Sequence, residues 1–159
     1  MCIRDRIQSK EVLICRMIAD LLNPRGQHGA GAEYLKIFLR DCLGMEKMDT
    51  KLADQAIVTA EYAIDDERRI DIVIEMGSYF LPIEVKIYAA DQKSQCFDYY
   101  QYAKRRDAQA KVYYLTLDGH RPGKDSTSSG SQSVPEEDIV CLSFLSLIHI
   151  SEPTRPLYI

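Results

Sequence analysis

Closely spaced cysteines are missing from this sequence. Its five cysteines are widely separated and none belongs to a C-x-x-C motif, which argues against a zinc knuckle and against a disulfide framework. An odd number of scattered cysteines instead indicates reduced, mostly buried thiols. We therefore expect a cytoplasmic protein.

Long apolar segments are also missing. No run of residues approaches the roughly 20 apolar positions that a membrane-spanning helix needs. The charges within residues 1–6 are not followed by an apolar segment, so we do not expect a signal peptide there. The sequence gives no reason to expect a membrane partner.

Positive charge is not in excess. The formal net charge is −4, which argues against a protein that binds nucleic acid through bulk charge alone. An enzyme whose carboxylates bind cations, and which has only a local basic strip for phosphates, remains compatible with this charge. Residues 104–106, Lys-Arg-Arg, could form such a strip or could be the solvated end of a helix.

The composition and the spacing of apolar residues predict one packed domain. The chain has 159 residues, of which 46% are hydrophobic and 28% are charged, and this balance suits a single folded core. Apolar residues at helical spacing predict helices over residues 9–22 and 32–43. A third helix is expected to run from an N-cap at Asp91 to about residue 106.

Alternating and apolar segments predict the strands of a mixed α/β domain. Residues 118–134, which are rich in serine, glycine and proline, are expected to form a flexible loop. The predicted strands cover residues 56–64, 69–76, 79–88, 111–117 and 138–144.

The pair Gly77-Ser78 predicts a β-hairpin, because glycine at the first central position permits a type II′ turn. Counting outward from this turn places Asp71 opposite Glu84, and residues directly opposite share a face. The second face then carries only apolar side chains, namely Ile70, Ile72, Ile74, Leu81, Ile83, Val85 and Ile87.

The charged face of this hairpin carries Asp71, Glu84 and Lys86. Two carboxylates placed opposite each other repel, so a divalent cation, Lys86 or a raised carboxylate pKa must compensate. Oxygen ligands suit Mg²⁺ or Mn²⁺, and Lys86 beside the metal could orient a water or stabilise phosphate charge. The alternative is a half-solvated hairpin with ordinary surface charges.

Two segments of this hairpin resemble the core motif of the PD-(D/E)xK nuclease superfamily. Asp71, in Arg-Ile-Asp-Ile-Val-Ile, matches the aspartate of the motif, and residues 84–86, Glu-Val-Lys, match its (D/E)xK part. Position 70 is isoleucine where the motif has proline. The segment Leu-Leu-Asn-Pro at 21–24, followed by His28-Gly29, is similar to one branch of bacterial and phage members.

The resemblance implies a restriction-endonuclease-like fold, with a mixed central β-sheet flanked by helices. It also implies that Mg²⁺, for which Mn²⁺ can substitute, is held by Asp71, Glu84 and the main-chain carbonyl of Val85. Lys86 would then assist hydrolysis of a phosphodiester in DNA. RNA as the substrate and a homodimer both remain open.

Two accessory positions follow from the same resemblance. Glu11 lies on the first predicted helix, where many members place an additional acidic residue that acts through water or a second metal. Gln95 lies on the helix after the motif and could orient Lys86 or a water. The alternatives are that Glu11 only favours the helix dipole and that Gln95 faces solvent.

The two ends of the chain do not fit this pattern. Residues 1–6 and 146–159 resemble peptides translated from sequencing-adapter DNA, so we expect the nuclease-like core to cover residues 7–145 and to be truncated at its C-terminus. Such a fragment could be inactive. The alternative function is therefore a catalytically inactive nucleic-acid-binding or protein-interaction domain with the same fold.

Overall fold

A single mixed β-sheet forms the centre of the computed structural model, which describes residues 3–151. The first three strands form an antiparallel meander, and the last two strands run parallel to the third. All five predicted strands are present. Their order across the sheet is β1 (Ile57–Ala63), β2 (Arg69–Met76), β3 (Tyr79–Lys86), β4 (Val112–Thr116) and β7 (Ile139–Ser143).

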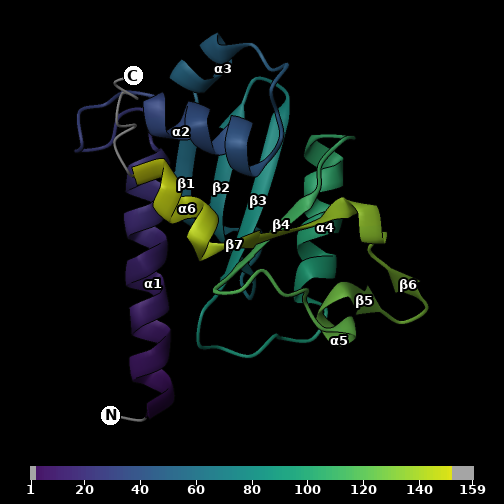
Figure 1. The fold of residues 1–159 in the computed structure, drawn as a ribbon. Helices are drawn as coiled ribbons and strands as arrows, with labels where there is room; N and C mark the ends of the chain where they lie inside the picture. Colours follow the sequence, from purple (N-terminus) through teal and green to yellow (C-terminus); the bar gives the residue numbers. More distant parts are fainter. Residues whose placement is uncertain (1–2, 152–159) are drawn as a thin grey trace.

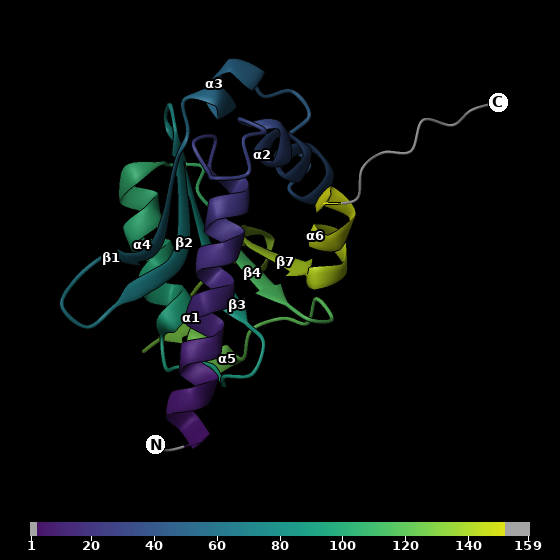
Figure 2. The same cartoon turned by 90° about the vertical axis from the view of Figure 1, so that its left-hand side faces the viewer.

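Helices cover both faces of this sheet (Figures 1 and 2). One face packs against α1 (Ile3–Leu22), α2 (Glu33–Ile37) with its π-helical continuation η1 (Phe38–Cys42), and α6 (Phe144–Ser151). The opposite face packs against α4 (Gln95–Arg106). The remaining elements are short: α3 (Thr50–Asp54), α5 (Lys124–Thr127), β5 (Ser128–Ser129), β6 (Gln132–Ser133) and η2 (Glu136–Asp138).

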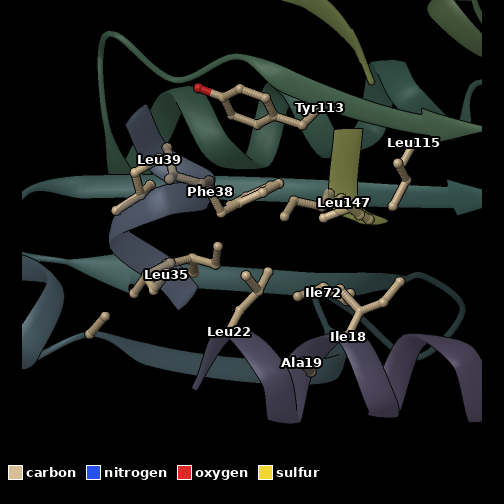
Figure 3. Close-up of a cluster of buried hydrophobic side chains, with 14 of the residues drawn as sticks. Ile18, Ala19, Leu22, Leu35, Phe38, Leu39, Ile72, Tyr113, Leu115 and Leu147 are labelled. Carbon is tan, nitrogen blue, oxygen red and sulfur yellow. The ribbon is translucent and has the colours of Figure 1, made fainter. Parts of the chain in front are cut away.

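The larger part of the core lies between α1, α2 and the sheet (Figure 3). Ile18 and Leu22 lie one turn apart on α1 and point toward Ile72 on β2, while Leu35 and Phe38 cover the sheet from the second helix. The side chains of Leu22, Leu35 and Phe38 are almost fully buried. Burial of each such side chain stabilises the fold by about 1.5–3 kcal/mol, so this packing fixes α1 against the sheet.

The second part of the core lies under α4. Cys96, Tyr99 and Ala103 recur at helical spacing and are buried against the sheet, where Tyr114 and Phe80 meet them. This packing places one face of α4 directly above β3 and β4. The carboxyl end of β3 is thereby enclosed by α1 on one side of the sheet and by α4 on the other.

The predicted N-cap of α4 is wrong. The helix begins at Gln95, and its N-cap is Ser94, which has a left-handed φ of 55° and makes no side-chain capping bond. Asp91 instead accepts hydrogen bonds from the Tyr114 hydroxyl at 2.6 Å and from the Gly123 N–H at 2.7 Å. Because its oxygens accept these long-range hydrogen bonds, Asp91 does not cap α4.

The segment 118–134 is more ordered than its composition predicts. It contains α5 and the β5–β6 hairpin. Ser126 is fully buried, and its Oγ accepts a hydrogen bond from the Cys96 N–H at 3.3 Å. Amino-acid composition alone does not predict tertiary contacts of this kind.

The basic side chains of residues 104–106 form ion pairs and hydrogen bonds within the protein. Lys104 Nζ lies 3.4 Å from Asp138 Oδ2, and Arg106 Nη2 lies 2.8 Å from Glu75 Oε1. Arg105 donates to the main-chain carbonyl of Gln101. Of the two sequence-based interpretations, the structure therefore favours a helix end over a phosphate-binding strip.

The ends of the described chain are helical. Helix α1 begins earlier than the predicted residue 9, and residues 146–151 belong to α6, whose Leu147 is buried in the core. Residues 1–2 and 152–159 lie outside the described part. The expected domain boundaries at 7 and 145 stay a prediction. No helix within residues 3–151 combines the length and the apolar content of a membrane span.

Candidate active site

The hairpin of β2 and β3 has the predicted register. Met76 pairs with Tyr79 around Gly77-Ser78, and the ladder continues to Ile72 opposite Ile83. Gly77 has a φ of +58°, a conformation in which glycine is not strained. The predicted turn and register are thus confirmed as far as Ile72 and Ile83; Asp71 and Glu84 lie just beyond the paired residues.

The predicted single apolar face is wrong at Ile70. Ile72 packs on the α1 side of the sheet, whereas Ile70 packs on the α4 side. The neighbouring strand β1 changes sides at the same level, where Glu61 has a left-handed φ of 54°. This local break in alternation lies at Asp71 on β2, and it is the physical reason for the wrong assignment.

The sheet opens between β2 and β3 beside Asp71. The ladder between these strands ends at Ile72 and Ile83. Beyond that pair, the Val85 N–H donates to Asp71 Oδ2 at 2.8 Å, so a side chain replaces a strand-to-strand bond. Strand β2 stays paired with β1, and β3 stays paired with β4. A cavity of about 540 Å³ lies at this opening.

Glu84 and Lys86 form a buried ion pair in the wall of this cavity. Lys86 Nζ lies 2.7 Å from Glu84 Oε1, and the two side chains are 8% and 1% exposed. Within residues 3–151, Glu84 Oε2 has no hydrogen-bond partner although it is buried. A buried carboxylate oxygen without a hydrogen-bond donor is costly, so a cation or a proton at this position would be stabilising.

Burial shifts the pKa values of both carboxyl groups, and the Asp71 charge adds to the shift of Glu84. Burial first, and then the Asp71 charge, raise the pKa of Glu84 well above its ordinary value. Burial also raises the pKa of Asp71, although the Val85 N–H and Lys86 oppose the shift. Burial alone would lower the pKa of Lys86, but the Glu84 charge and hydrogen bond outweigh it and raise the pKa.

The donor atoms at this site fit a hard divalent cation. Asp71 and Glu84 supply adjacent carboxylate oxygens, one of which is buried without a partner. The described residues contain no group of three or more His, Cys, Asp and Glu side chains suited to a metal. Further ligands of such a cation would have to be main-chain oxygens, for example of Val85, which lines the cavity, or water.

Glu11 reaches the site from α1. Its Oε1 accepts hydrogen bonds from the N–H groups of Ile87, Tyr88 and Ala89 at 3.0, 2.8 and 2.9 Å. Because α1 begins at Ile3, Glu11 lies well inside the helix, and the simple helix-dipole interpretation is wrong. The carboxylate instead holds the backbone that directly follows Lys86.

Gln95 is buried rather than solvent-facing, with 6% of its surface exposed. Its Nε2 donates to the Tyr99 hydroxyl at 3.0 Å, and that hydroxyl donates to the main-chain carbonyl of Arg69. The side chain lines the same cavity as Lys86. Gln95 therefore links α4 to the start of β2, close to Asp71.

The structure brings all six predicted site residues, Val85 included, to one cavity, together with residues that were not predicted from the sequence. Arg69 directly precedes the motif and could have been noticed from its position alone. Nothing in the sequence predicted that Glu61 lines the cavity, because its position depends on an unusual backbone conformation. The missed lining residues with charged side chains are Glu61, Glu67, Arg68, Arg69 and Asp91.

Comparison with known proteins agrees with this geometry. A family model described as the PD-(D/E)XK nuclease superfamily matches residues 3–156. Searches of curated proteins and of solved structures each gave no significant match. The matched family indicates nuclease activity, and the mixed five-stranded sheet with flanking helices is the restriction-endonuclease-like fold. The chain therefore belongs to the PD-(D/E)XK nuclease superfamily.

Proposed function

We propose that this protein is a metal-dependent nuclease that hydrolyses phosphodiester bonds of DNA at the opening between β2 and β3. The observation that carries the proposal is the buried Glu84 Oε2, which lacks a partner beside the Asp71 carboxylate. Two adjacent, partly desolvated carboxylates repel each other unless a cation or a proton compensates. A divalent cation resolves both the repulsion and the missing contact.

Asp71, Glu84 and the main-chain carbonyl of Val85 are the residues that would hold Mg²⁺, for which Mn²⁺ can substitute. Such a cation, when bound, stabilises phosphate charge and lowers the pKa of water. The Val85 N–H keeps the Asp71 carboxylate oriented, because it occupies one of its oxygens. The Asp71 carboxylate also contacts the Glu84 carboxyl group, so one cation could bind both.

Lys86 is the candidate residue for donating hydrogen bonds and supplying positive charge at the reacting phosphate. Its ammonium group is held 2.7 Å from Glu84 Oε1, and its raised pKa keeps it protonated. A protonated lysine in a partly desolvated wall donates hydrogen bonds to a phosphate oxygen or to an attacking water. We assign Lys86 this role.

Glu11 and Gln95 support these groups from two directions. Glu11 fixes residues 87–89, which follow Lys86, and Gln95 fixes the start of β2 through Tyr99. Neither side chain needs to contact the substrate for these contacts to matter, because small displacements of reacting groups strongly reduce rates. We assign both residues to positioning.

A thermal-shift titration with Mg²⁺ and Mn²⁺ tests the metal site without a substrate. Metal should stabilise the wild type, by about 2.7 kcal/mol at a hundredfold excess over the dissociation constant. Asp71→Asn and Glu84→Gln should not respond. Cleavage of single-stranded DNA, duplex DNA and RNA then identifies the substrate, with Lys86→Ala as the inactive control.

A folded wild type that shows no response at millimolar metal would overturn this proposal. A clear metal response without cleavage of any nucleic acid would instead favour the inactive binding domain. The two measurements therefore separate the metal site from its use in catalysis.

A further inference from the structure

The cavity between β2 and β3 is lined by six carboxylate side chains and only three cationic ones. A nucleic-acid phosphate is an anion, and carboxylates repel it unless cations in the cavity are free to bind it. Under the proposed function, a bound metal would compensate the charge at the reacting phosphate only. The three cationic side chains, Arg68, Arg69 and Lys86, decide how the neighbouring phosphates are held.

Two of these three cations are already engaged within the protein. Lys86 Nζ forms the buried ion pair with Glu84. Arg68 Nε donates to Asp98 Oδ2 at 2.9 Å, and both of its terminal nitrogens also donate to acceptors near α4. Arg68 therefore serves to tie β2 to the start of α4.

The guanidinium of Arg69 is different. Among the residues that the structure describes, no carboxylate, carbonyl or hydroxyl accepts a hydrogen bond from this side chain, which is exposed at the cavity. Its main chain, in contrast, is fixed by the buried Tyr99 hydroxyl, which donates to the Arg69 carbonyl. A free guanidinium on an anchored backbone is thus placed two residues from Asp71.

We propose that Arg69 binds a backbone phosphate of the nucleic-acid substrate, adjacent to the phosphate that reacts at Asp71 and Glu84. This inference rests on the proposed nuclease function. A guanidinium presents several N–H donors in a planar fork that matches two phosphate oxygens. Because every nucleotide carries such a phosphate, the contact contributes affinity and register without sequence preference.

The inference also explains why Gln95 and Tyr99 are buried beneath this position. Their hydrogen-bonded chain ends on the Arg69 carbonyl, so it fixes the backbone from which the guanidinium extends. Within residues 3–151, neither Gln95 nor Tyr99 hydrogen-bonds the Lys86 ammonium group, whose partner is Glu84. Gln95 therefore acts on substrate placement through Arg69.

The test compares Arg69→Gln with Arg105→Gln. Both changes remove one exposed arginine charge, but Arg105 lies on α4 outside the cavity. Affinity for fluorescein-labelled single-stranded DNA, duplex DNA and RNA oligonucleotides is measured by anisotropy over a range of salt concentrations. Ca²⁺, another cation with oxygen ligands, replaces Mg²⁺, and gels confirm that the probes stay intact.

We expect Arg69→Gln to weaken binding roughly tenfold at low salt. The slope of log affinity against log salt should fall by about one, as for the loss of one phosphate contact. Arg105→Gln should keep the wild-type affinity and slope. Arg69→Lys, which keeps the charge without the fork, should lie between the wild type and Arg69→Gln.

Unchanged affinity and slope in Arg69→Gln would overturn the inference, as would an equal loss in Arg105→Gln. A wild type that binds none of the three probes would overturn it as well. The thermal response of Arg69→Gln to Mn²⁺ should match that of the wild type, because Arg69 is not a metal ligand. A missing metal response in the wild type counts against the proposed function instead.

Discussion

Asp71 Oδ2 accepts a hydrogen bond from the Val85 N–H at 2.8 Å, across the opening between two strands that are otherwise paired. The same carboxylate lies beside Glu84 and contributes to the raised pKa of that group. Asp71 thus closes the strand pairing through an acceptor oxygen and, under the proposed function, supplies negative charge for a metal. Substitutions can separate these two roles.

Asparagine at position 71 keeps the acceptor oxygen but removes the charge. Without divalent metal, we expect Asp71→Asn to be at least as stable as the wild type, because repulsion with Glu84 is relieved. Asp71→Ala should be about 1–3 kcal/mol less stable than Asp71→Asn, because the Val85 N–H loses its acceptor. Urea unfolding in EDTA measures both values, and equal stabilities would contradict the assigned hydrogen bond.

The raised pKa of Glu84 predicts an unusual pH dependence for the metal-free protein. Between about pH 4.5, the ordinary value, and the raised folded value, the folded state holds a proton that the unfolded chain has released. Stability without metal should therefore fall as the pH rises through this window, and Asp71 acts in the same direction.

Urea unfolding as a function of pH in EDTA tests this dependence. Glu84→Gln should flatten the slope, because the titrating group is removed. Glu67→Gln is the matched control, since Glu67 lines the same cavity but is exposed. A wild-type stability that rises with pH across the window would contradict the prediction.

The three N–H groups that donate to Glu11 predict a difference between two substitutions at this position. Glutamine retains an acceptor oxygen, so Glu11→Gln should keep most of the wild-type stability and activity. Glu11→Ala leaves the three donors unsatisfied and should cost about 2 kcal/mol, with faster proteolysis near residues 87–93. Urea unfolding and limited proteolysis are the measurements. If Glu11→Gln lost as much stability and activity as Glu11→Ala, the site would require the carboxylate charge and not the acceptor oxygen.

The chain from Gln95 through Tyr99 to the Arg69 carbonyl should behave as one unit. Tyr99→Phe removes a buried hydroxyl with partners on both sides and should destabilise the protein by about 1–3 kcal/mol. Tyr113→Phe is the control, because Tyr113 is buried and its hydroxyl makes no such hydrogen bond within residues 3–151. A double-mutant cycle with Gln95→Ala should give a coupling energy of at least about 0.5 kcal/mol, and additive effects would contradict the chain.

The hairpin that carries the site was predictable because its determinants are local. The Gly77-Ser78 turn sets the register, and the alternation of apolar residues sets the buried face, so Asp71, Glu84 and Lys86 could be placed together from the sequence. The break at Ile70 was not predictable, because it depends on a left-handed residue in the neighbouring strand.

The supporting contacts lie beyond the reach of a local argument. Glu11 binds residues that follow β3, far along the chain, and only the packing of α1 on the sheet brings them together. Asp91 was predicted as a helix cap because aspartate favours that position. In the structure its oxygens instead accept hydrogen bonds from the Tyr114 hydroxyl and the Gly123 N–H. Residue type predicted the chemistry of these side chains, and tertiary structure selected their partners.

The side-chain bond that replaces a ladder bond at Val85 gives this site a built-in reporter. If a cation binds the Asp71 carboxylate, as proposed, Asp71 should become a weaker acceptor for the Val85 amide, while the pairing of β3 with β4 should stay the same. Hydrogen exchange at this one amide should therefore follow the loading of the site, while amides of the paired strands keep their protection. Occupancy of the centre thus becomes readable from the backbone itself, in the absence of any substrate.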